Sequence, residues 1–327
     1  MPIQTLELPS DRYIWDCWFA QHNSEYHLFY LHAPKTIANP ELRHWNVAIG
    51  HACSTDLQKW ELLPDALHPG PEFEKYTWTG STLYHRNQWY LFFSYSRSQE
   101  RGLIQRVGVA TSTDAVTWHE HPEPIIEADP RYYEQLDLDL WHDQSWRDPW
   151  VFQHPSGDFY ALITARANHG HPQTRGVIAL ARALTPELLT WEVLPPIAQP
   201  QQYGAMECPQ LVFIDGRYYL IFSSLPFHTS GEMGTYYMVG DAPLGPFSEP
   251  RKLCVDPIGR FYAGKLLQST DGEWYFVAWR NLARDCTFLG DLIAPVPVRI
   301  DRAGYLSLPE LQNRLSELQS FSCPVTT

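Results

Sequence analysis

The sequence predicts an all-β fold, a five-bladed β-propeller that forms a single domain over residues 1–327. Three observations indicate this fold. A strand–turn–strand pattern recurs five times, at intervals of roughly 55 to 70 residues. Aromatic side chains, which favour strands, make up 14% of the chain. No helical period persists for long, and self-similarity at the length of a four-stranded unit is typical of propellers.

Each repeat begins with a hairpin whose second strand is rich in aromatic side chains. Two repeats start this strand with an Asp-Gly pair, at 215–216 and 271–272. Glycine accepts the positive φ of a tight turn, so this pair before an alternating apolar run is a strong hairpin signal. The turn-and-strand segments lie at residues 25–31, 87–94, 157–163, 215–222 and 271–277. The blades are accordingly expected to start near residues 13, 78, 146, 205 and 260.

The second half of the repeat contains a further shared segment. Residues 50–56 (Gly-His-Ala-Cys-Ser-Thr-Asp) match residues 108–114 (Gly-Val-Ala-Thr-Ser-Thr-Asp), and a Trp follows each segment at the same spacing. Two stretches do not fit the repeat, the acidic stretch Glu127–Asp143 and the short C-terminal tail 309–327, and we expect irregular or helical additions there. Proline is spread among turns rather than concentrated in a linker, which favours one domain.

Charge and composition disfavour several kinds of partner. With 24 Lys and Arg against 37 Asp and Glu, the formal net charge is −13, so neither nucleic acid nor an anionic membrane is expected to bind. No window approaches about 20 consecutive apolar residues, and residues 1–7 lack the features of a secretory signal. Six cysteines without a Cys-x-x-Cys spacing argue against a zinc site or a disulfide framework. We therefore expect a reduced, cytoplasmic protein.

The sequence predicts neither a metal nor a cofactor. The candidate ligands His169 and His171 belong to residues 168–172, a run that is typical of a solvated loop. Asp137 and Asp139 could bind calcium, but they lack the Asp-x-Asp-x-Asp-Gly pattern of a calcium loop. The oligomeric state is not predicted by any feature of the sequence.

Three carboxylates stand within or just before apolar runs, each in a different repeat. Asp16 lies between aromatic residues, and Asp148 and Glu207 each precede an apolar strand. Burying a carboxylate is costly without partners, so three such exceptions in equivalent positions point to a function. Because the first strands of the blades surround the axis of a propeller, we expect the three acids to converge on one funnel. For a single acid, a local ion pair such as that of Asp148 with Arg147 is an equal alternative.

Two carboxylates that face a sugar are the minimum apparatus for glycosidic cleavage. One donates a proton to the leaving oxygen, and the other attacks the anomeric carbon or activates water. A third acid can accept hydrogen bonds from sugar hydroxyls as positive charge develops on the ring. Aromatic side chains in a cleft offer flat faces that suit a sugar. The pattern therefore indicates a small carbohydrate as the partner.

Several motifs resemble, in the same order, those of glycoside hydrolase family 32, the invertases and fructanases. Residues 50–67 resemble the strand–turn segment of that family. The later signatures are matched by residues 78–81 (Trp-Thr-Gly-Ser), 147–149 (Arg-Asp-Pro), 207–209 (Glu-Cys-Pro) and 261–263 (Phe-Tyr-Ala). The resemblance extends over nearly the whole predicted propeller, and it is specific because the motifs occur together and in register.

The opening motif Trp-Asp-Cys-Trp, at residues 15–18, departs from the Asn-Asp-Pro opening that is usual in family 32. It is closer to the Trp-Asp-Ser-Trp of family 68, the levansucrases. The resemblance implies Asp16 as nucleophile, Glu207 as acid/base and Asp148 as stabiliser of the transition state. The residues that it implies for substrate binding are Trp15, Trp18, Trp78, Ser81, Arg147 and Tyr262.

The expected activity is that of a retaining β-fructofuranosidase acting on sucrose or short fructo-oligosaccharides. A fructosyl–enzyme ester forms and is released to water or, in transfructosylation, to another sugar. Two alternatives stay open, an inverting enzyme of the family 43 type acting on arabinosides or xylosides and a catalytically inactive sugar-binding propeller. A separation of about 5 to 5.5 Å between the Asp16 and Glu207 carboxyls indicates retention, and one of about 6.5 to 9.5 Å indicates inversion.

Overall fold

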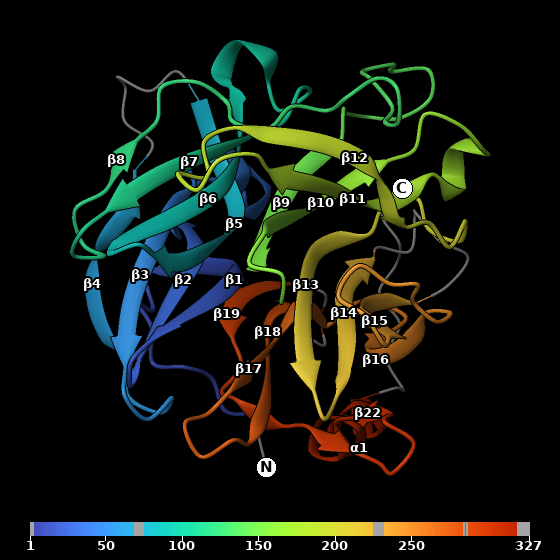
Figure 1. Ribbon diagram of the computed structural model, residues 1–327. Coiled ribbons are helices and arrows are strands. Elements are labelled where there is room, and N and C mark those ends of the chain that lie inside the picture. The colour runs from blue at the N-terminus through green and yellow to red at the C-terminus, as the bar shows by residue number, and fades with distance from the viewer. Residues whose placement is uncertain (1–2, 69–74, 225–231, 284, 286, 319–327) are drawn as a thin grey trace.

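The computed structural model describes residues 3–68, 75–224, 232–283, 285 and 287–318. These residues form five four-stranded sheets around a common axis (Figure 1). This is the all-β, five-bladed, single-domain propeller that the repeat predicts. In blades 1 to 4 the strands neighbour one another in chain order, and in blade 5 the last strand pairs back with the second.

The strands of each blade follow the sequence repeats. Blade 1 consists of β1 (Arg12–His22), β2 (Glu25–Pro34), β3 (Ala48–Ser54) and β4 (Glu61–Leu67). Blade 2 consists of β5 (Lys75–His85), β6 (Gln88–Arg97), β7 (Arg106–Ser112) and β8 (His119–Glu120). Blade 3 consists of β9 (Trp146–Gln153), β10 (Phe159–Arg166), β11 (Gly176–Ala183) and β12 (Trp191–Ala198). Blade 4 consists of β13 (Glu207–Ile214), β14 (Arg217–Ser224), β15 (Met233–Gly240) and β16 (Arg251–Asp256). Blade 5 consists of β17 (Phe261–Gln268), β18 (Trp274–Leu282), β19 (Phe288–Leu292) and β20 (Val296–Pro297).

The second strands of the first three blades are deeply buried. Nearly every residue of β2 and β6, and every residue of β10, is buried. Such a strand is covered on both faces by the adjacent blades, and its apolar residues therefore form a run instead of an alternation. The outermost strands β4 and β12 are more exposed. The core thus consists of the layers between blades.

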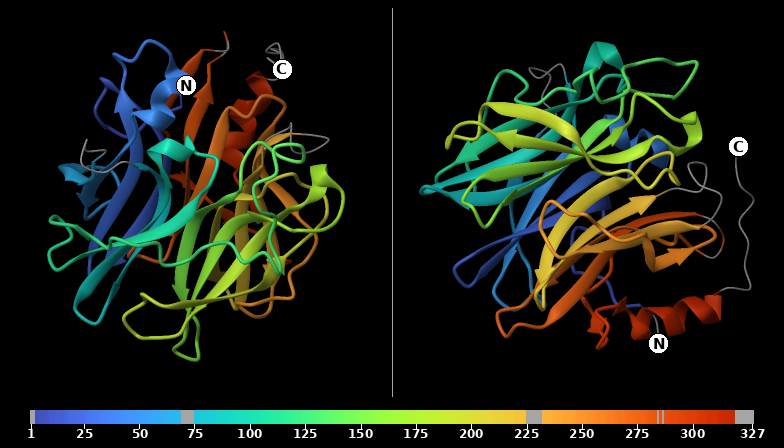
Figure 2. Two further views of the ribbon diagram at one scale, coloured as in Figure 1. Left: turned by 90° about the horizontal axis from the view of Figure 1, so that it is seen from above. Right: turned by 45° about the vertical axis from the view of Figure 1, so that its right-hand side comes forward.

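The ring closes through the inner strands and the N-terminal segment. Each inner strand contacts the next around the axis, and β17 of the last blade contacts β1 of the first. The N-terminal segment joins blade 5, because Thr5 forms a β-bridge with Ile293 and the amide of Leu6 donates to the carbonyl of Leu292 at 3.0 Å. Ile3 and Gln4, at the start of the described chain, line a small cavity together with residues of helix α1 (Pro309–Leu318), the last described element, which is drawn in red in Figure 2.

The two stretches outside the repeat differ from each other. The acidic stretch Glu127–Asp143 contains turns and bridges but no helix, and it connects β8 with β9. A β-bridge between Tyr133 and Ala167 ties it to blade 3. The tail begins with α1, whose Leu311 is buried in the core cluster of blades 4 and 5. Residues 319–327 of the tail lie outside the described part of the chain.

Each inner strand is interrupted at the same height by a β-bulge. In blade 1 the pairing with β2 skips Asp16, and in blade 2 the pairing with β6 skips Thr79. In blades 3, 4 and 5 two residues face a single partner, and these are Asp148-Pro149, Cys208-Pro209 and Ala263-Gly264. A bulge aims side chains away from the regular alternation of a strand, and here all five lie around the axis.

The bulges of blades 3, 4 and 5 share a left-handed residue. The φ angles are 57° at Asp148, 52° at Cys208 and 49° at Ala263. Proline follows in two of them, and a bulge tolerates it because the proline nitrogen donates no ladder hydrogen bond. Left-handed backbone at residues other than glycine is unfavourable and persists only where the surrounding structure stabilises it. These three positions are therefore candidates for a functional role.

Candidate active site

The inner-strand bulges surround a cavity of about 520 Å³ at one end of the axis. Asp16, Asp148 and Glu207 all line it, and they come from blades 1, 3 and 4. The three acids that the sequence singles out are therefore brought together. Thr79 and Tyr262 from the two remaining blades complete the ring.

A second hollow, of about 890 Å³, lies between the N-terminal segment and turns of blades 1 and 5. Its carboxylates, Glu7, Asp56 and Asp271, are exposed. Exposed acids have ordinary solvation and no site built around them. The smaller cavity is the candidate active site because its acids are buried or partly buried and have hydrogen-bond partners.

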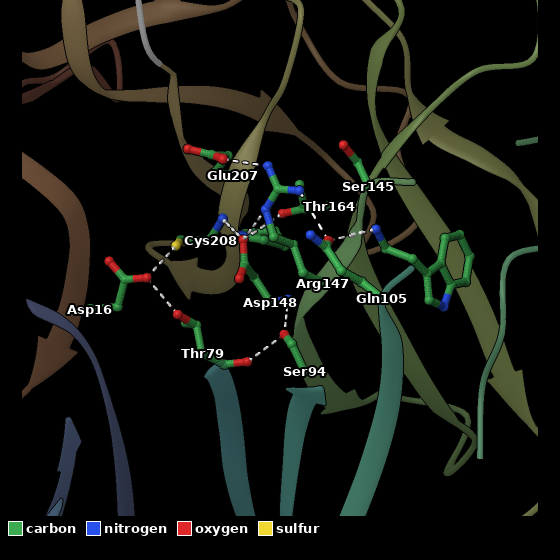
Figure 3. A network of polar contacts seen from close by, with 12 residues as sticks. Asp16, Thr79, Ser94, Gln105, Ser145, Arg147, Asp148, Thr164, Glu207 and Cys208 are labelled. Atoms are coloured by element: carbon green, nitrogen blue, oxygen red, sulfur yellow. Dashed lines mark hydrogen bonds and ion pairs between the residues drawn. The ribbon is translucent and has the colours of Figure 1, made fainter. Parts of the chain in front are cut away.

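Asp16 is held by the neighbouring bulges (Figure 3). Its Oδ2 accepts a hydrogen bond from the Thr79 hydroxyl at 2.5 Å and lies 3.7 Å from the Cys208 thiol. Burial raises the pKa of Asp16, and the negative charge of Glu207 adds to that rise. The Thr79 hydrogen bond and the positive charge of Lys265 act against it. The net effect of the site is to raise the pKa of Asp16, and Thr79 and Lys265 partly offset this rise in favour of the ionised form.

Asp148 is buried, with 5% of its surface exposed. Its Oδ2 accepts hydrogen bonds from the Thr164 hydroxyl at 2.9 Å and from the Cys208 amide at 3.0 Å. Its own amide donates to the Ser94 hydroxyl at 2.6 Å. Burial raises the pKa of Asp148 to about 6, although the adjacent Arg147 lowers it. This carboxylate is fixed in place and can accept hydrogen bonds from a ligand.

Glu207 lies between a cation and a phenol. Arg147 Nη2 donates to Glu207 Oε1 at 2.5 Å, and the Tyr262 hydroxyl donates to Oε2. Burial of Tyr262 raises its pKa well above the ordinary value, and the charge of Glu207 adds to this, so the phenol keeps its proton. Burial alone would lower the pKa of Arg147, but the carboxylates of Asp143, Glu207 and Asp148 hold it above the ordinary value.

Aromatic side chains line the wall of the cavity on blades 1 and 2. Trp15 and Trp78 both line it, one residue before the bulged Asp16 and Thr79. Trp78 is fixed by a hydrogen bond from its Nε1 to the His44 carbonyl at 3.1 Å. Together with Tyr262, they place ring faces and edges beside the acids, an arrangement that suits a sugar.

The structure corrects the placement of Trp18 and Ser81, which the resemblance implies as substrate-binding residues. Trp18 is fully buried, stacks on Phe29 and donates from its Nε1 to Thr82 at 2.9 Å. Ser81 accepts a hydrogen bond from the Val151 amide at 3.0 Å. Both lie three residues beyond a cavity-lining Trp, about 10 Å along an extended strand. They therefore belong to the core of the propeller.

The equivalence of the three acids is also corrected. In the bulge geometry, the counterpart of Asp148 is Cys208, because both are the left-handed first residue of a two-residue bulge. Glu207 comes one position earlier and corresponds to Arg147 and Tyr262. Aligning the shared proline of Arg-Asp-Pro (147–149) and Glu-Cys-Pro (207–209) gives the same offset, and the register between strands confirms it.

Several residues of the site were not singled out by the sequence analysis. Thr79 lies inside the motif 78–81 but was not assigned a contact. Asp143 ends the acidic stretch, and Gln105 lies just before β7. Both line the cavity. No sequence signal marks Gln105, because its position depends on a contact between two loops that are 38 residues apart.

No metal-binding cluster is evident in the described residues, among which no group of three or more His, Cys, Asp or Glu side chains is placed to hold an ion. Within the same residues, no helix has the length and apolar character needed to cross a membrane. Four cysteines in this part of the chain, at 17, 53, 208 and 254, are free thiols.

Comparison with known proteins adds a family match. A model described as the glycosyl hydrolases family 32 N-terminal domain matches residues 18–287. The match begins two residues after Asp16, in agreement with the unusual opening motif at 15–18.

Curated relatives share about a quarter of their residues with this chain. An extracellular sucrase of Zymomonas mobilis is 24% identical, and the alignment covers 86% of this chain and 76% of the sucrase. A sucrose-6-phosphate hydrolase of Lactococcus lactis is 24% identical over 81% of this chain, but only 55% of the hydrolase is covered. The chain therefore spans about half the length of that relative.

Solved structures share the fold. An inulosucrase from Halalkalicoccus jeotgali bound to kestose has a TM-score of 0.72 and 20% identity, with 92% of this chain and 89% of that chain covered. A Bombyx mori GH32 β-fructofuranosidase has a TM-score of 0.67 and 21% identity, with 92% and 63% covered. At such identities the likeness is one of fold.

Proposed function

The chain belongs to glycosyl hydrolase family 32, and we propose that it hydrolyses β-fructofuranosidic bonds with retention of configuration. The proposed substrates are sucrose and short fructo-oligosaccharides, with transfer of the fructosyl group to another sugar as a second outcome. One observation carries the proposal: three carboxylates from three blades, the buried Asp148 and the partly buried Asp16 and Glu207, face a single cavity. A sugar ring in that cavity would meet all three.

In the first half of the proposed reaction, Asp16 attacks the anomeric carbon C2 of the fructosyl group. The bond between C2 and the bridging oxygen breaks, and Glu207 donates a proton to that oxygen as it leaves. The products of this step are a fructosyl ester on Asp16 and a free alcohol, which is glucose when sucrose reacts. Thr79 and Lys265 support Asp16 as an anion before the attack.

In the second half, Glu207 is a carboxylate and removes a proton from an incoming water. The water oxygen attacks C2, the ester bond breaks and Asp16 returns as a carboxylate. Two displacements at the same carbon restore its original configuration. A sugar hydroxyl that replaces the water gives transfructosylation by the same proton transfer.

The other groups of the cavity act on the sugar ring or on Glu207. Asp148 is fixed by two donors, and its remaining acceptor capacity can bind ring hydroxyls more strongly as positive charge develops. Arg147 and Tyr262 orient the two oxygens of Glu207. Trp15 and Trp78 form an apolar wall against which the fructosyl ring can pack.

The test combines two variants with product analysis by NMR. Asp16→Asn and Glu207→Gln should each lower kcat on sucrose by at least about 10³-fold while the fold is retained. Asp11→Asn is the matched control, because this exposed carboxylate precedes the same strand and, within the described part of the chain, forms its ion pair with Arg12. The first fructose released by the wild type should have the β configuration. Near-normal activity in either variant, or an inverted product, contradicts the assigned roles.

We also propose that the protein works in a reduced, cytoplasmic compartment. The four free cysteines of the described residues support this, since cysteines of proteins in oxidising compartments are commonly paired in disulfides. Fractionation of the source cells tests the proposal. Activity recovered outside the cytoplasm contradicts it.

A further inference from the structure

The acidic stretch Glu127–Asp143 ends in a carboxylate that the proposed reaction does not use. Asp143 is 9% exposed and lies at the edge of the cavity. Its Oδ1 accepts from the Ser145 hydroxyl at 2.7 Å, and its Oδ2 accepts from Gln105 Nε2 at 2.9 Å. A carboxylate with this degree of burial and two neutral donors is held firmly in one orientation.

Gln105 links this carboxylate to Arg147, and Figure 3 shows Gln105 beside Arg147. Its Oε1 accepts from Arg147 Nη1 at 3.1 Å and from the Trp146 amide at 3.2 Å. Arg147 Nη1 also lies 3.3 Å from Asp143 Oδ2. One edge of the guanidinium is therefore held by Gln105 and Asp143, while Nη2 on the other side donates to Glu207.

We propose that Asp143 and Gln105 are positioning residues that control the proton-donating carboxyl of Glu207 through Arg147. This inference rests on the proposed function, in which Glu207 donates a proton to the leaving group. Arg147 carries one positive charge and shares it among three carboxylates, those of Asp143, Asp148 and Glu207. Without Asp143, a larger share of the charge would act on Glu207 and would favour its anion at the step that requires its proton.

Gln105 contributes geometry to this arrangement. A guanidinium is planar, and its donors lie in fixed directions. Fixing Nη1 therefore also fixes the direction in which Nη2 meets Glu207. Because proton transfer depends on short, aligned contacts, a small rotation of Arg147 would misplace the acid relative to the leaving oxygen.

Glu207 also faces other titratable groups, and none of them would be changed by variants of Asp143 or Gln105. These groups are Asp16 on β1, His44 on the segment before β3, Asp148 on β9, Cys208 on β13 and Tyr262 on β17. A change in acid catalysis in these variants would therefore report on the connection through Arg147.

The experiment compares two leaving groups. Sucrose needs protonation of its leaving oxygen, whereas an aryl β-fructofuranoside with a 4-nitrophenolate leaving group needs little. Asp143→Asn and Gln105→Leu should lower kcat on sucrose by about 10- to 100-fold. On the aryl fructoside, the same variants should lose less than about 3-fold, since general acid catalysis contributes little there.

Two further variants calibrate the comparison. Asp129→Asn makes the same chemical change in the same acidic stretch, where the carboxylate pairs, as far as the described residues show, with the exposed Arg131, and it should leave activity on both substrates unaffected. Ser145→Ala removes one of the hydrogen bonds to Asp143 and should show the same selectivity between leaving groups, with a smaller loss on sucrose.

The outcomes separate the proposal from its rivals. Equal losses on both substrates indicate a structural role and overturn the proposal. A raised KM for sucrose with unchanged kcat indicates direct contact with the leaving sugar and also overturns it. If Asp143→Asn does not fold, Gln105→Leu, which leaves every charge in place, gives the same comparison. Failure of the wild type on both substrates would instead contradict the proposed function.

Discussion

The inner strands of blades 1 and 2 differ from those of blades 3, 4 and 5 in what their bulges present to the cavity. In blades 1 and 2 a tryptophan precedes a single bulged polar residue, Asp16 or Thr79. In the other blades, the preceding residues are Arg147, Glu207 and Tyr262. These three contact one another in a row.

This difference divides the cavity into two halves with different chemistry. The half formed by blades 1 and 2 offers an apolar wall and one carboxylate, which suits binding of the sugar and attack on it. The half formed by blades 3 to 5 offers a continuous polar row, which suits proton transfer. The same kind of bulge therefore contributes a binding wall in blades 1 and 2 and a polar row in blades 3 to 5, because the residue before the bulge determines which side chain faces the cavity.

The two halves also differ in their internal support. The left-handed residues of blades 3 to 5 are unfavourable by about 1 kcal/mol or more each. The bulge of blade 4 is held by Lys265, whose ammonium donates to the carbonyls of Cys208 at 2.5 Å and Pro209 at 3.3 Å. Lys265 is 2% exposed, and no ion pair with a carboxylate is recorded for it among the described residues. Blades 1 and 2 have no left-handed residue at their bulges.

The largest expected effect that tests this comparison comes from Asp148→Asn. Loss of the anion that stabilises the developing charge should lower kcat on sucrose by about 10²- to 10³-fold. The same change should raise stability at pH 7. Burial raises the pKa of Asp148 from 3.8 to about 6, so the folded state binds this proton more tightly than the unfolded state does.

The sign of the pH effect follows from that difference. Above pH 6 the native carboxylate is ionised against its preference, which costs up to about 3 kcal/mol of unfolding free energy. Below pH 4 both states are protonated and no cost remains. Urea unfolding should therefore show Asp148→Asn more stable than the wild type at pH 7, with the gain fading between pH 6 and 4. A gain that grows toward acid pH contradicts this interpretation.

The next effect in size is expected from Lys265→Met, which removes the support of the blade 4 bulge. Two buried carbonyls lose their donor, at about 1 to 3 kcal/mol each. Loss of the positive charge also raises the pKa of Asp16 further. Urea unfolding should show a lower free energy of unfolding, and kcat should fall by roughly 10-fold. The exposed Lys59→Met is the matched control, and an equally small effect of both variants would contradict the supporting role.

Most of the fold can be predicted from the sequence repeats, because each repeat marks the start of one blade. The inner strands start at residues 12, 75, 146, 207 and 261, against expected starts near 13, 78, 146, 205 and 260. An apolar hairpin with an Asp-Gly turn is a local property, so the sequence displays it directly. The turns of the acidic stretch cannot be predicted from the local sequence, since they depend on long-range contacts with blade 3.

The sequence predicts the residues of the site less completely than it predicts the fold. Asp16, Asp148 and Glu207 stand out because carboxylates beside apolar runs are unusual. The offset between Asp148 and Glu207 follows from the shared proline at positions 149 and 209, but the bulge at these positions depends on how each inner strand pairs with its neighbour. Trp18 and Ser81 share motifs with cavity residues, but strand geometry carries them into the core. A motif therefore predicts which segment of the chain reaches the cavity, but the position of the bulge determines which residue of that segment lines it.

The smallest effect is expected from Thr79→Val, which removes the only polar side chain that the blade 2 bulge contributes. The hydroxyl lowers the pKa of Asp16, so its loss should raise that pKa further above its ordinary value. Because the nucleophile must be ionised, the acid limb of the kcat/KM profile should move to higher pH, by about one pH unit or less. Activity on sucrose at neutral pH should fall by less than about 10-fold. Thr113→Val, an exposed change in the same blade, controls for the loss of a hydroxyl. If the acid limb does not move, Thr79 does not influence the ionisation of Asp16, and blade 2 supplies only the aromatic wall. The two halves of the cavity would then differ more in chemistry than the polar residue at the blade 2 bulge indicates.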